Sequence, residues 1–392
     1  MSLRVHCAMK ILMLSDVYFP RVNGVATSIA SFRAALIRQG HEVVLVCPEY
    51  RGDEKDEPGI WRVASRSVPH DPEDRIMRYR HVMALVCGLN PRHFDIIHVH
   101  TPFIAHYAGI ALGKRFGIPV VATYHTLFEE YLHHYVRWLP QRWLRFAARR
   151  LSVHQCHQLD ALIVPSRIIA DTLQRYGVRT AQRVISTGLA PELFAKPTGE
   201  DDFRQRYGLP AKAPLLLFVG RAAFEKNIHF LIDMLPGVLA KHPQARLVIT
   251  GEGPALEALK RHAHHTGVAE AVVFIGYLER SGSLQDAYRA ADVFVFASRT
   301  ETQGLVLLEA MAMATPVVST AVMGTSEVLV DGEGCLIADD NQQDFACKVN
   351  QLLSHAPQRI ALGVRGQAYA AQWHEDIKTA ELVAFYRQLA SS

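Results

Sequence analysis

Two glutamates flank a glycine in the segment Ser298–Ala312 at a spacing that suits an extended ligand. Glu301 precedes Gly304, where a helix is predicted to begin, and Glu309 follows with seven residues between the two glutamates. Glu309 would lie about 7 Å along that helix at 1.5 Å per residue. Each carboxylate can bind a diol, while the amides of Gly304 and Leu305 suit a phosphate. A glutamate in an otherwise apolar helix is costly unless it is paired, which favours a functional role.

Two cations follow a predicted strand at residues 214–219. Arg221 and Lys226 come in the loop after this strand, with Glu225 beside the lysine. Arginine offers a planar fork of donors and lysine a point charge, and both suit a diphosphate. A solvated basic loop without a ligand is equally compatible with these residues.

Three histidines stand at or near strand ends. His125 follows the predicted strand 119–123, where a histidine can exchange a proton with a reacting group, although a lone histidine is more often structural. His98 and His100 alternate on one strand, but no third metal ligand stands at a useful spacing. The sequence also contains no Asp-x-Asp, a common way to hold a divalent ion on a nucleotide phosphate. We therefore predict neither a bound metal nor a cofactor.

A further glycine stands between a strand and a helix. Asn23 and Gly24 end the loop after the predicted strand 10–14, just before the predicted helix 25–39. A glycine there allows a ligand to approach backbone amides at a helix N-terminus, where an anion is favoured. An ordinary turn glycine is the alternative, and this loop alone favours it.

The segment 131–159 contains no acidic residue. Its arginines and aromatic residues alternate, and those predicted to contact an acceptor or a membrane are Arg137, Trp138, Arg142, Trp143, Arg145 and Arg149. A basic helix with aromatic residues is typical of an element attracted to an anionic lipid surface. Nucleic acid would want a similar patch, but no recognition motif accompanies it, so we predict no nucleic-acid partner. The alternative is an amphipathic helix that packs its aromatic residues on the core.

These residues need a scaffold, and the hydrophobic pattern predicts one. Apolar runs alternate with segments of helical period, and the predicted strands are 10–14, 43–47, 95–100, 119–123 and 161–165, then 214–219, 245–250, 272–275, 293–297 and 316–319. Continuous apolar strands between helices indicate parallel sheets covered on both faces. Residues 187–210 form the best linker, and residues 51–80 read as loop. The fold class is therefore α/β with two doubly wound domains.

Composition and charge agree with an ordinary globular protein of 392 residues. Hydrophobic residues make up 49% and charged residues 20%, and no apolar run approaches the roughly 18 residues of a membrane span. The six cysteines are scattered, which favours reduced thiols, and we expect a cytoplasmic protein without a secretory signal. The net charge of +4 divides into +9 over residues 1–190 and −5 over the remainder, which predicts different partners for the two halves.

The order of these elements resembles the family 4 glycosyltransferases, retaining enzymes with the GT-B fold. The resemblance runs nearly end to end and rests on Asn23-Gly24, on Gly220-Arg221 with Glu225-Lys226, and on the pair Glu301 and Glu309. The segments that look most similar to the diacylglycerol glucosyltransferase branch are His98-Val-His-Thr-Pro102, Tyr124-His-Thr126, Val164-Pro-Ser166 and Thr300–Leu305. The loop Tyr18–Gly24 also resembles sulfoquinovosyl- and mannosyltransferases.

The resemblance implies a role for each of these residues. Arg221 and Lys226 would bind the diphosphate of a nucleotide sugar, and Glu309 would hold the ribose. Glu301 would hold the sugar hydroxyls, and His125 would contact the sugar near the reacting carbon. Gly24, Glu225, Gly304 and Leu305 would complete the donor site.

The resemblance also implies an organisation and a reaction. Residues 1–195 would bind the acceptor, residues 196–366 the donor, and residues 367–392 would form helices that cross back to the first domain. The expected reaction is metal-independent transfer of a hexose, with UDP-glucose favoured, to a lipid such as diacylglycerol at the inner face of the cell membrane. Alternatives are a GDP-mannose-dependent enzyme with a polysaccharide, polyprenyl-linked or soluble acceptor, a nucleotide-sugar 2-epimerase, and a non-enzymatic subunit of a synthesis complex. A dehydrogenase is disfavoured because Gly251-Glu-Gly253-Pro lacks a third glycine.

Overall fold

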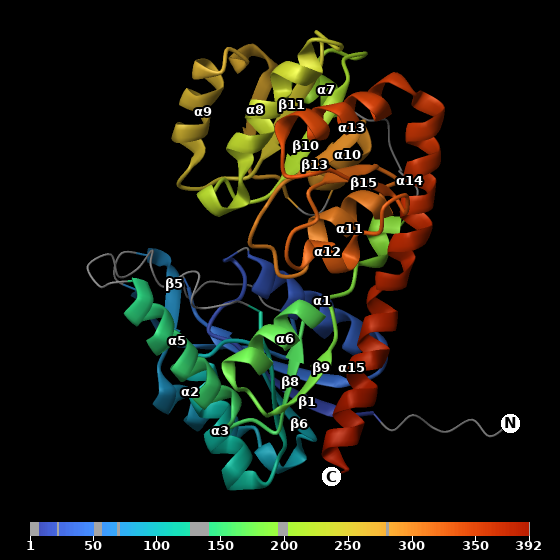
Figure 1. Ribbon diagram of the computed structural model, residues 1–392. Coiled ribbons are helices and arrows are strands. Elements are labelled where there is room, and N and C mark those ends of the chain that lie inside the picture. The colour runs from blue at the N-terminus through green and yellow to red at the C-terminus, as the bar shows by residue number, and fades with distance from the viewer. Residues whose placement is uncertain are drawn as a thin grey trace, which may run out of the picture. The chain divides into compact units, whose positions relative to one another are not determined.

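The computed structural model (Figure 1) describes residues 8–21, 23–50, 57–68, 71–125, 141–194, 203–279 and 282–391. The chain forms two compact units. Unit 1 comprises residues 1–188 and 375–392, and unit 2 comprises residues 189–374. The predicted linker falls partly at residues 195–202, which lie outside the described residues.

Unit 1 is built on a parallel sheet with the strand order β3-β2-β1-β6-β7-β8-β9. Its strands are β1 (Lys10–Leu14), β2 (Glu42–Pro48), β3 (Ile60–Val63), β6 (Ile96–Val99), β7 (Val120–Thr123), β8 (Ala161–Val164) and β9 (Ala181–Val184). The central strands carry continuous apolar runs because both faces of the sheet are covered.

The prediction of loop for residues 51–80 is wrong for most of the described part of that segment. β3 adds an edge strand to the sheet, β4 (Ser65–Val68) pairs antiparallel with β5 (Asp71–Met77), and a helix begins at Tyr79. β4 and β5 are rich in charged and polar residues, and β3 has only four residues, one of them Arg62, so none of the three shows the continuous apolar run that marks a buried strand.

Helices cover the two faces of the unit 1 sheet. They are α1 (Gly24–Arg38), α2 (Tyr79–Gly88), α3 (Ile104–Phe116), α5 (Gln141–Cys156), α6 (Arg167–Tyr176) and α15 (Glu375–Ala390). On one face, Phe32 of α1 and Tyr386 of α15 join Ile11 of β1 in a buried apolar cluster, and α1 and α15 run side by side (Figure 1). On the other face, α3 approaches so closely that a Cβ at Gly109 would lie 2.6 Å from Val99 Cγ2.

Unit 2 repeats this plan with a parallel sheet ordered β12-β11-β10-β13-β14-β15. Its strands are β10 (Leu215–Val219), β11 (Arg246–Thr250), β12 (Val272–Gly276), β13 (Val293–Phe296), β14 (Val317–Ser319) and β15 (Cys335–Ile337). Its helices are α7 (Phe203–Arg206), α8 (Ile228–Leu239), α9 (Leu256–His265), α10 (Ser283–Ala290), α11 (Leu305–Ala312), α12 (Thr325–Val328), α13 (Gln342–Ser354) and α14 (Ala356–Ala370). The predicted α/β class with two doubly wound sheets is confirmed.

Each sheet contains one point where the strand order reverses. In unit 2 the chain continues from β10 to β11 on one side, while β13 pairs with β10 on the other side. In unit 1 the same reversal occurs between β1 and β6. The loops at the carboxyl ends of such strands diverge and leave a crevice, which is the usual ligand position in open α/β sheets.

Candidate functional site

An ion pair joins the two loops at the reversal point of unit 2. Lys226 ends the turn after β10, and Glu301 lies in the loop between β13 and α11. Lys226 Nζ donates to Glu301 Oε2 at 2.6 Å, and the two side chains keep 18% and 21% of their surface exposed. The structure therefore brings together two residues separated by 75 positions. A cation and a carboxylate at this place can bind a phosphate and sugar hydroxyls side by side.

Buried backbone contacts fix the loop that carries Lys226. The side chain of Asn227 donates from Nδ2 to the carbonyl of Ala297 at 3.0 Å, which ties this loop to the end of β13. The loop after β11 packs directly on it, because a Cβ at Gly251 would lie 2.1 Å from the Gly220 carbonyl oxygen. Gly251 also has a φ of +114°, which favours glycine. The glycine pair at 251 and 253 thus serves close packing of two loops.

Glu309 is buried on α11, with 3% of its surface exposed. Its Oε2 accepts a hydrogen bond from the hydroxyl of Tyr288 on α10 at 2.9 Å. The tyrosine supplies the partner that a buried carboxylate requires. Gly304 caps the N-terminus of α11 with a φ of +81°, and Leu305 is the first residue of the helix, as predicted. Glu301 therefore lies in the short loop that leads into the N-terminus of α11.

The remaining predicted donor residues lie on the same side of unit 2. Arg221 is exposed at the start of the loop after β10, and Glu225 is half-buried in the turn Phe224–Lys226. Arg299 of the loop after β13 binds Asp340 at 2.9 Å, and both side chains are largely exposed. The loops after β10 and β13 therefore combine cations with the carboxylate of Glu301.

In unit 1 the predicted glycine stands at the N-terminus of a long helix. Gly24 is the first residue of α1, and Asn23 Oδ1 accepts from the amide of Ala26 at 2.9 Å. A Cβ placed on Gly24 would meet no atom within 4 Å, and its φ is not in the left-handed region. The fold of the described residues thus makes no demand for glycine at this exposed position.

His125 lies at the end of β7 and contacts a second histidine. Its Nε2 is 3.2 Å from Nδ1 of His100, and their rings stack with centroids 5.5 Å apart. Burial lowers the pKa of His125 to about 4 and that of His98 to about 3, so both are neutral at pH 7. The imidazole of His125 is therefore a neutral hydrogen-bonding group whose orientation depends on His100.

The basic and aromatic segment is partly described. Arg137 and Trp138 lie outside the described residues, and Arg142 and Arg145 lie on α5. Trp143 and Phe146 of α5 are 71% and 59% exposed, which does not fit the alternative in which these rings pack on the core. The guanidinium of Arg150 lies 5.8 Å above the Phe146 ring. Arg149 lies 4.6 Å above the ring of Tyr176 of α6.

Two further structural facts bound the site. Within the described ranges, no helix combines the length and the apolar character needed to cross a membrane.

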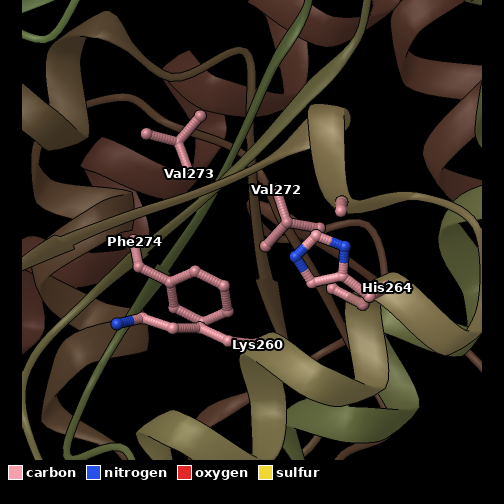
Figure 2. Close-up of a pocket in the computed structure, with 7 residues that line it drawn as sticks. Lys260, His264, Val272, Val273 and Phe274 are labelled. Atoms are coloured by element: carbon pink, nitrogen blue, oxygen red, sulfur yellow. The ribbon is translucent and has the colours of Figure 1, made fainter.

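A cavity of about 350 Å³ lies between α9 and β12 of unit 2, and Figure 2 shows Lys260 and His264 of α9 beside Val272 and Phe274 of β12. None of the residues that line it belongs to the predicted donor site.

Sequence reasoning missed three residues that build these sites. Tyr288 and Asn227 act through tertiary contacts, which local residue spacing does not predict. Asp16, which follows β1, is the third, and its Oδ2 accepts from Thr101 Oγ1 at 2.8 Å and from the Ala105 amide at 3.0 Å. Burial raises the Asp16 pKa to about 6. The position of an acidic residue directly after a buried strand is the signal by which Asp16 could have been found.

Comparisons with known proteins place the chain in a family. Residues 22–193 match the family model described as Glycosyltransferase Family 4, and residues 199–368 match that described as Glycosyl transferases group 1. An alpha-monoglucosyldiacylglycerol synthase of Streptococcus pneumoniae is 33% identical over 79% of this chain and 71% of the relative. A GDP-mannose-dependent alpha-mannosyltransferase of Mycobacterium tuberculosis is 28% identical over 94% of each chain.

A solved structure agrees on the fold. The HepE protein of Anabaena, crystallised with UDP and glucose, superposes with a TM-score of 0.75 at 19% identity, and the match covers 98% of this chain and 100% of HepE. This likeness, the two doubly wound sheets and the family matches lead to one conclusion. The chain belongs to glycosyltransferase family 4 and has the GT-B fold.

Proposed function

We propose that this glycosyltransferase moves glucose from UDP-glucose to a membrane lipid such as diacylglycerol, with retention of the anomeric configuration and without a metal ion. The observation that carries the donor half is the contact between Lys226 and Glu301 at the reversal point of the unit 2 sheet. A cation and a carboxylate lie next to each other here, beside the N-terminus of α11, as a phosphate and neighbouring sugar hydroxyls would require. That is the order of groups in a nucleotide diphosphate sugar.

The donor would lie across unit 2 with its ribose at one glutamate and its sugar at the other. Glu309, oriented by Tyr288, would bind the ribose hydroxyls, and Glu301 would bind the sugar hydroxyls. Lys226 and Arg221 would bind the diphosphate and stabilise the charge that grows on it as the bond to the sugar breaks. In this arrangement the two cations would stabilise the diphosphate as a divalent ion does in other enzymes, so no metal ion would be needed.

Unit 1 would supply the binding site for the acceptor and two contacts with the donor. The N-terminus of α1 at the exposed Gly24 would suit a donor phosphate, and His125 would hydrogen-bond the sugar near the reacting carbon. We assign no covalent nucleophile to this site.

A lipid acceptor is supported by the exposed face of α5. Trp143 and Phe146 are one turn apart on this helix and share a face, with Arg150 over the Phe146 ring. Aromatic rings beside arginines are suited to the headgroup region, where the rings enter the acyl boundary and the cations meet anionic lipid. This arrangement supports peripheral binding at the inner face of the cell membrane.

The membrane assignment can be tested by vesicle sedimentation. The variant Trp143→Ser, Phe146→Ser should lose most of its binding to vesicles that contain anionic phosphatidylglycerol, and wild-type binding should weaken as salt rises. Ile360→Ser in unit 2 is a matched control, because Ile360 is 64% exposed on α14. Equal loss in the control, or no loss in the α5 variant, would return this helix to an ordinary surface role.

The donor and acceptor can be tested together. Labelled UDP-glucose, UDP-galactose, UDP-glucuronate and GDP-mannose would each be offered with diacylglycerol vesicles and with soluble sugars. We expect label in the organic phase from UDP-glucose. The mannosyltransferase relative, which matches 94% of this chain, favours GDP-mannose as the second candidate donor. Turnover of GDP-mannose with label only in the aqueous phase would replace the proposal by that one.

A further inference from the structure

A row of three histidine rings crosses the carboxyl ends of β6 and β7 in unit 1. His98 lies on β6, His100 directly follows it, and His125 follows β7, which pairs with β6. The ring centroids of His98 and His100 are 3.9 Å apart, and those of His100 and His125 are 5.5 Å apart. The function proposed above uses only His125, so the other two rings need an explanation.

His98 is held between two hydroxyl groups. Tyr386 Oη of α15 is 2.5 Å from His98 Nδ1, and Thr123 Oγ1 of β7 is 2.6 Å from His98 Nε2. Burial keeps the imidazole neutral, so one nitrogen donates and the other accepts. A phenol is the more acidic hydroxyl and the better donor, so Tyr386 donates to Nδ1 and His98 donates from Nε2 to Thr123. Both nitrogens of His98 are therefore used in joining α15 to β7.

His100 differs because only one of its nitrogens has a partner. Its Nδ1 lies 3.2 Å from His125 Nε2, while its Nε2 is buried and has no hydrogen-bond partner among the residues that the structure describes. A buried N–H without an acceptor is rarer in proteins than a buried acceptor without a donor. The proton of His100 is therefore best placed on Nδ1, where it is bonded, and the lone pair on Nε2.

We infer that His100 is a positioning residue that donates from Nδ1–H to Nε2 of His125 and thereby holds His125 as its Nδ1–H tautomer. His125 then presents a hydrogen-bond donor to its ligand, and its basic nitrogen is occupied. Such a group suits a hydroxyl or ring oxygen of a sugar. It neither removes a proton from an acceptor nor attacks the anomeric carbon. This assignment rests on the proposed contact of His125 with the donor sugar.

Nitrogen NMR of histidine-labelled protein tests the tautomer directly. The resonances of His125 and His100 would be assigned by their loss in His125→Gln and His100→Phe, and long-range proton couplings distinguish Nδ1–H from Nε2–H. We expect Nδ1–H at both residues in the wild-type protein. A proton on Nε2 of His125 would overturn the inference, whatever the kinetic results.

Matched variants separate positioning from packing. His100→Asn keeps an N–H close to the place of Nδ1 and should retain the His125 tautomer and most of the turnover number. His100→Phe keeps the ring but removes the donor, so the turnover number should fall about tenfold, the size expected for one lost hydrogen bond, with KM for the donor sugar within about twofold. His98→Phe is the packing control and should destabilise unit 1 while leaving the His125 tautomer intact.

The outcomes distinguish this inference from the proposed function. Full activity of His125→Gln would remove His125 from the sugar site but leave the tautomer measurement valid. Wild-type turnover and an unchanged His125 tautomer in His100→Phe would show that His100 only fills space, and would overturn the inference even if transfer to lipid is observed.

Discussion

The pair formed by Lys226 and Glu301 makes a prediction that separates its two members. If Lys226 binds the diphosphate and Glu301 binds the sugar, Lys226→Met should lower the affinity for both UDP and UDP-glucose. Glu301→Gln should lower the affinity for UDP-glucose alone. Glu301→Gln also releases Lys226 from a contact of 2.6 Å, so its affinity for UDP should be unchanged or higher. Methionine keeps the stem of lysine, and glutamine keeps the shape of glutamate.

The magnitudes follow from the geometry. Lys226 and Glu301 keep about one fifth of their side-chain surface exposed, so the pair lies between exposed pairs, worth about 0.2–1 kcal/mol, and buried ones, which cost about 3–5 kcal/mol to break. Each single change should therefore lower the free energy of unfolding by about 1–2 kcal/mol and leave the fold intact. Loss of a charge-assisted hydrogen bond of about 1.5–3 kcal/mol corresponds to roughly 10- to 150-fold in ligand affinity.

The assay is titration calorimetry of UDP and of UDP-glucose on each variant, with turnover measured in parallel. Turnover of both variants should fall by about 100-fold or more, the typical loss of one group that stabilises a transition state. Asp340→Asn is the control, because it breaks the exposed ion pair with Arg299 that follows the same strand. Equal losses of UDP affinity in Lys226→Met and Glu301→Gln, or wild-type turnover in either, would refute this division of roles.

Three further predictions follow from single contacts. Gly304→Ala should lower the free energy of unfolding by about 1–2 kcal/mol and lower the affinity for UDP-glucose, because φ is +81° and the new Cβ would lie 2.9 Å from Leu307 Cδ1. Denaturant unfolding measures the first effect and calorimetry the second, and unchanged values would contradict the prediction. Tyr288→Phe should weaken UDP-glucose, because the buried Glu309 loses a donor at 2.9 Å; the unfolding free energy should fall by about 1.5–3 kcal/mol. Unit 1 should lose stability as pH falls from 6.5 towards 4, which urea unfolding at pH 7 and pH 5 would reveal, and equal midpoints would contradict it.

The direction in which acid changes the stability follows from the pKa values of these groups in the folded and the unfolded state. Burial depresses the pKa of His125 to about 4 and that of His98 to about 3, and it lowers that of His100 well below its usual value. Below pH 6.5 the unfolded chain therefore binds protons that the folded chain does not. Each histidine then lowers the free energy of unfolding by about 1.4 kcal/mol for every unit that the pH falls. Asp16 acts in the opposite direction between pH 6 and 4, because burial raises its pKa to about 6. Together the three histidines lower the free energy of unfolding by more than Asp16 raises it.

The sheets were predictable where burial leaves a mark on the sequence. Strands such as β1 and β10 are covered on both faces and therefore read as unbroken apolar runs. β3, β4 and β5 were not predicted because charged or polar residues interrupt their sequences and because they lie at the edge of the sheet or in a separate antiparallel pair. No local pattern distinguishes such strands from a polar loop.

The proximity of the candidate donor-site residues was predictable where those residues lie in short sequence segments. Glu301, Gly304 and Glu309 fall within one strand-to-helix connection, and Lys226 follows another strand, so the rule that ligands lie at carboxyl ends brought them together. Tyr288 could not be found this way, because its pairing with Glu309 depends on how α10 packs on α11. On sequence alone, His100 was considered only as half of a metal pair with His98, and that role was rejected for want of a third ligand, whereas the structure gives His100 a contact with His125.

The most direct test of the central claim is the product made from UDP-glucose and diacylglycerol vesicles. Purified protein would be incubated with labelled donor, the lipid extracted, and the anomeric proton of the product examined by NMR, with Lys226→Met in parallel. The account predicts an α-linked glucosyl lipid in the organic phase from the wild-type protein and about 100-fold less from the variant. A β-linked product, equal product from Lys226→Met, or no turnover of any nucleotide sugar would contradict it.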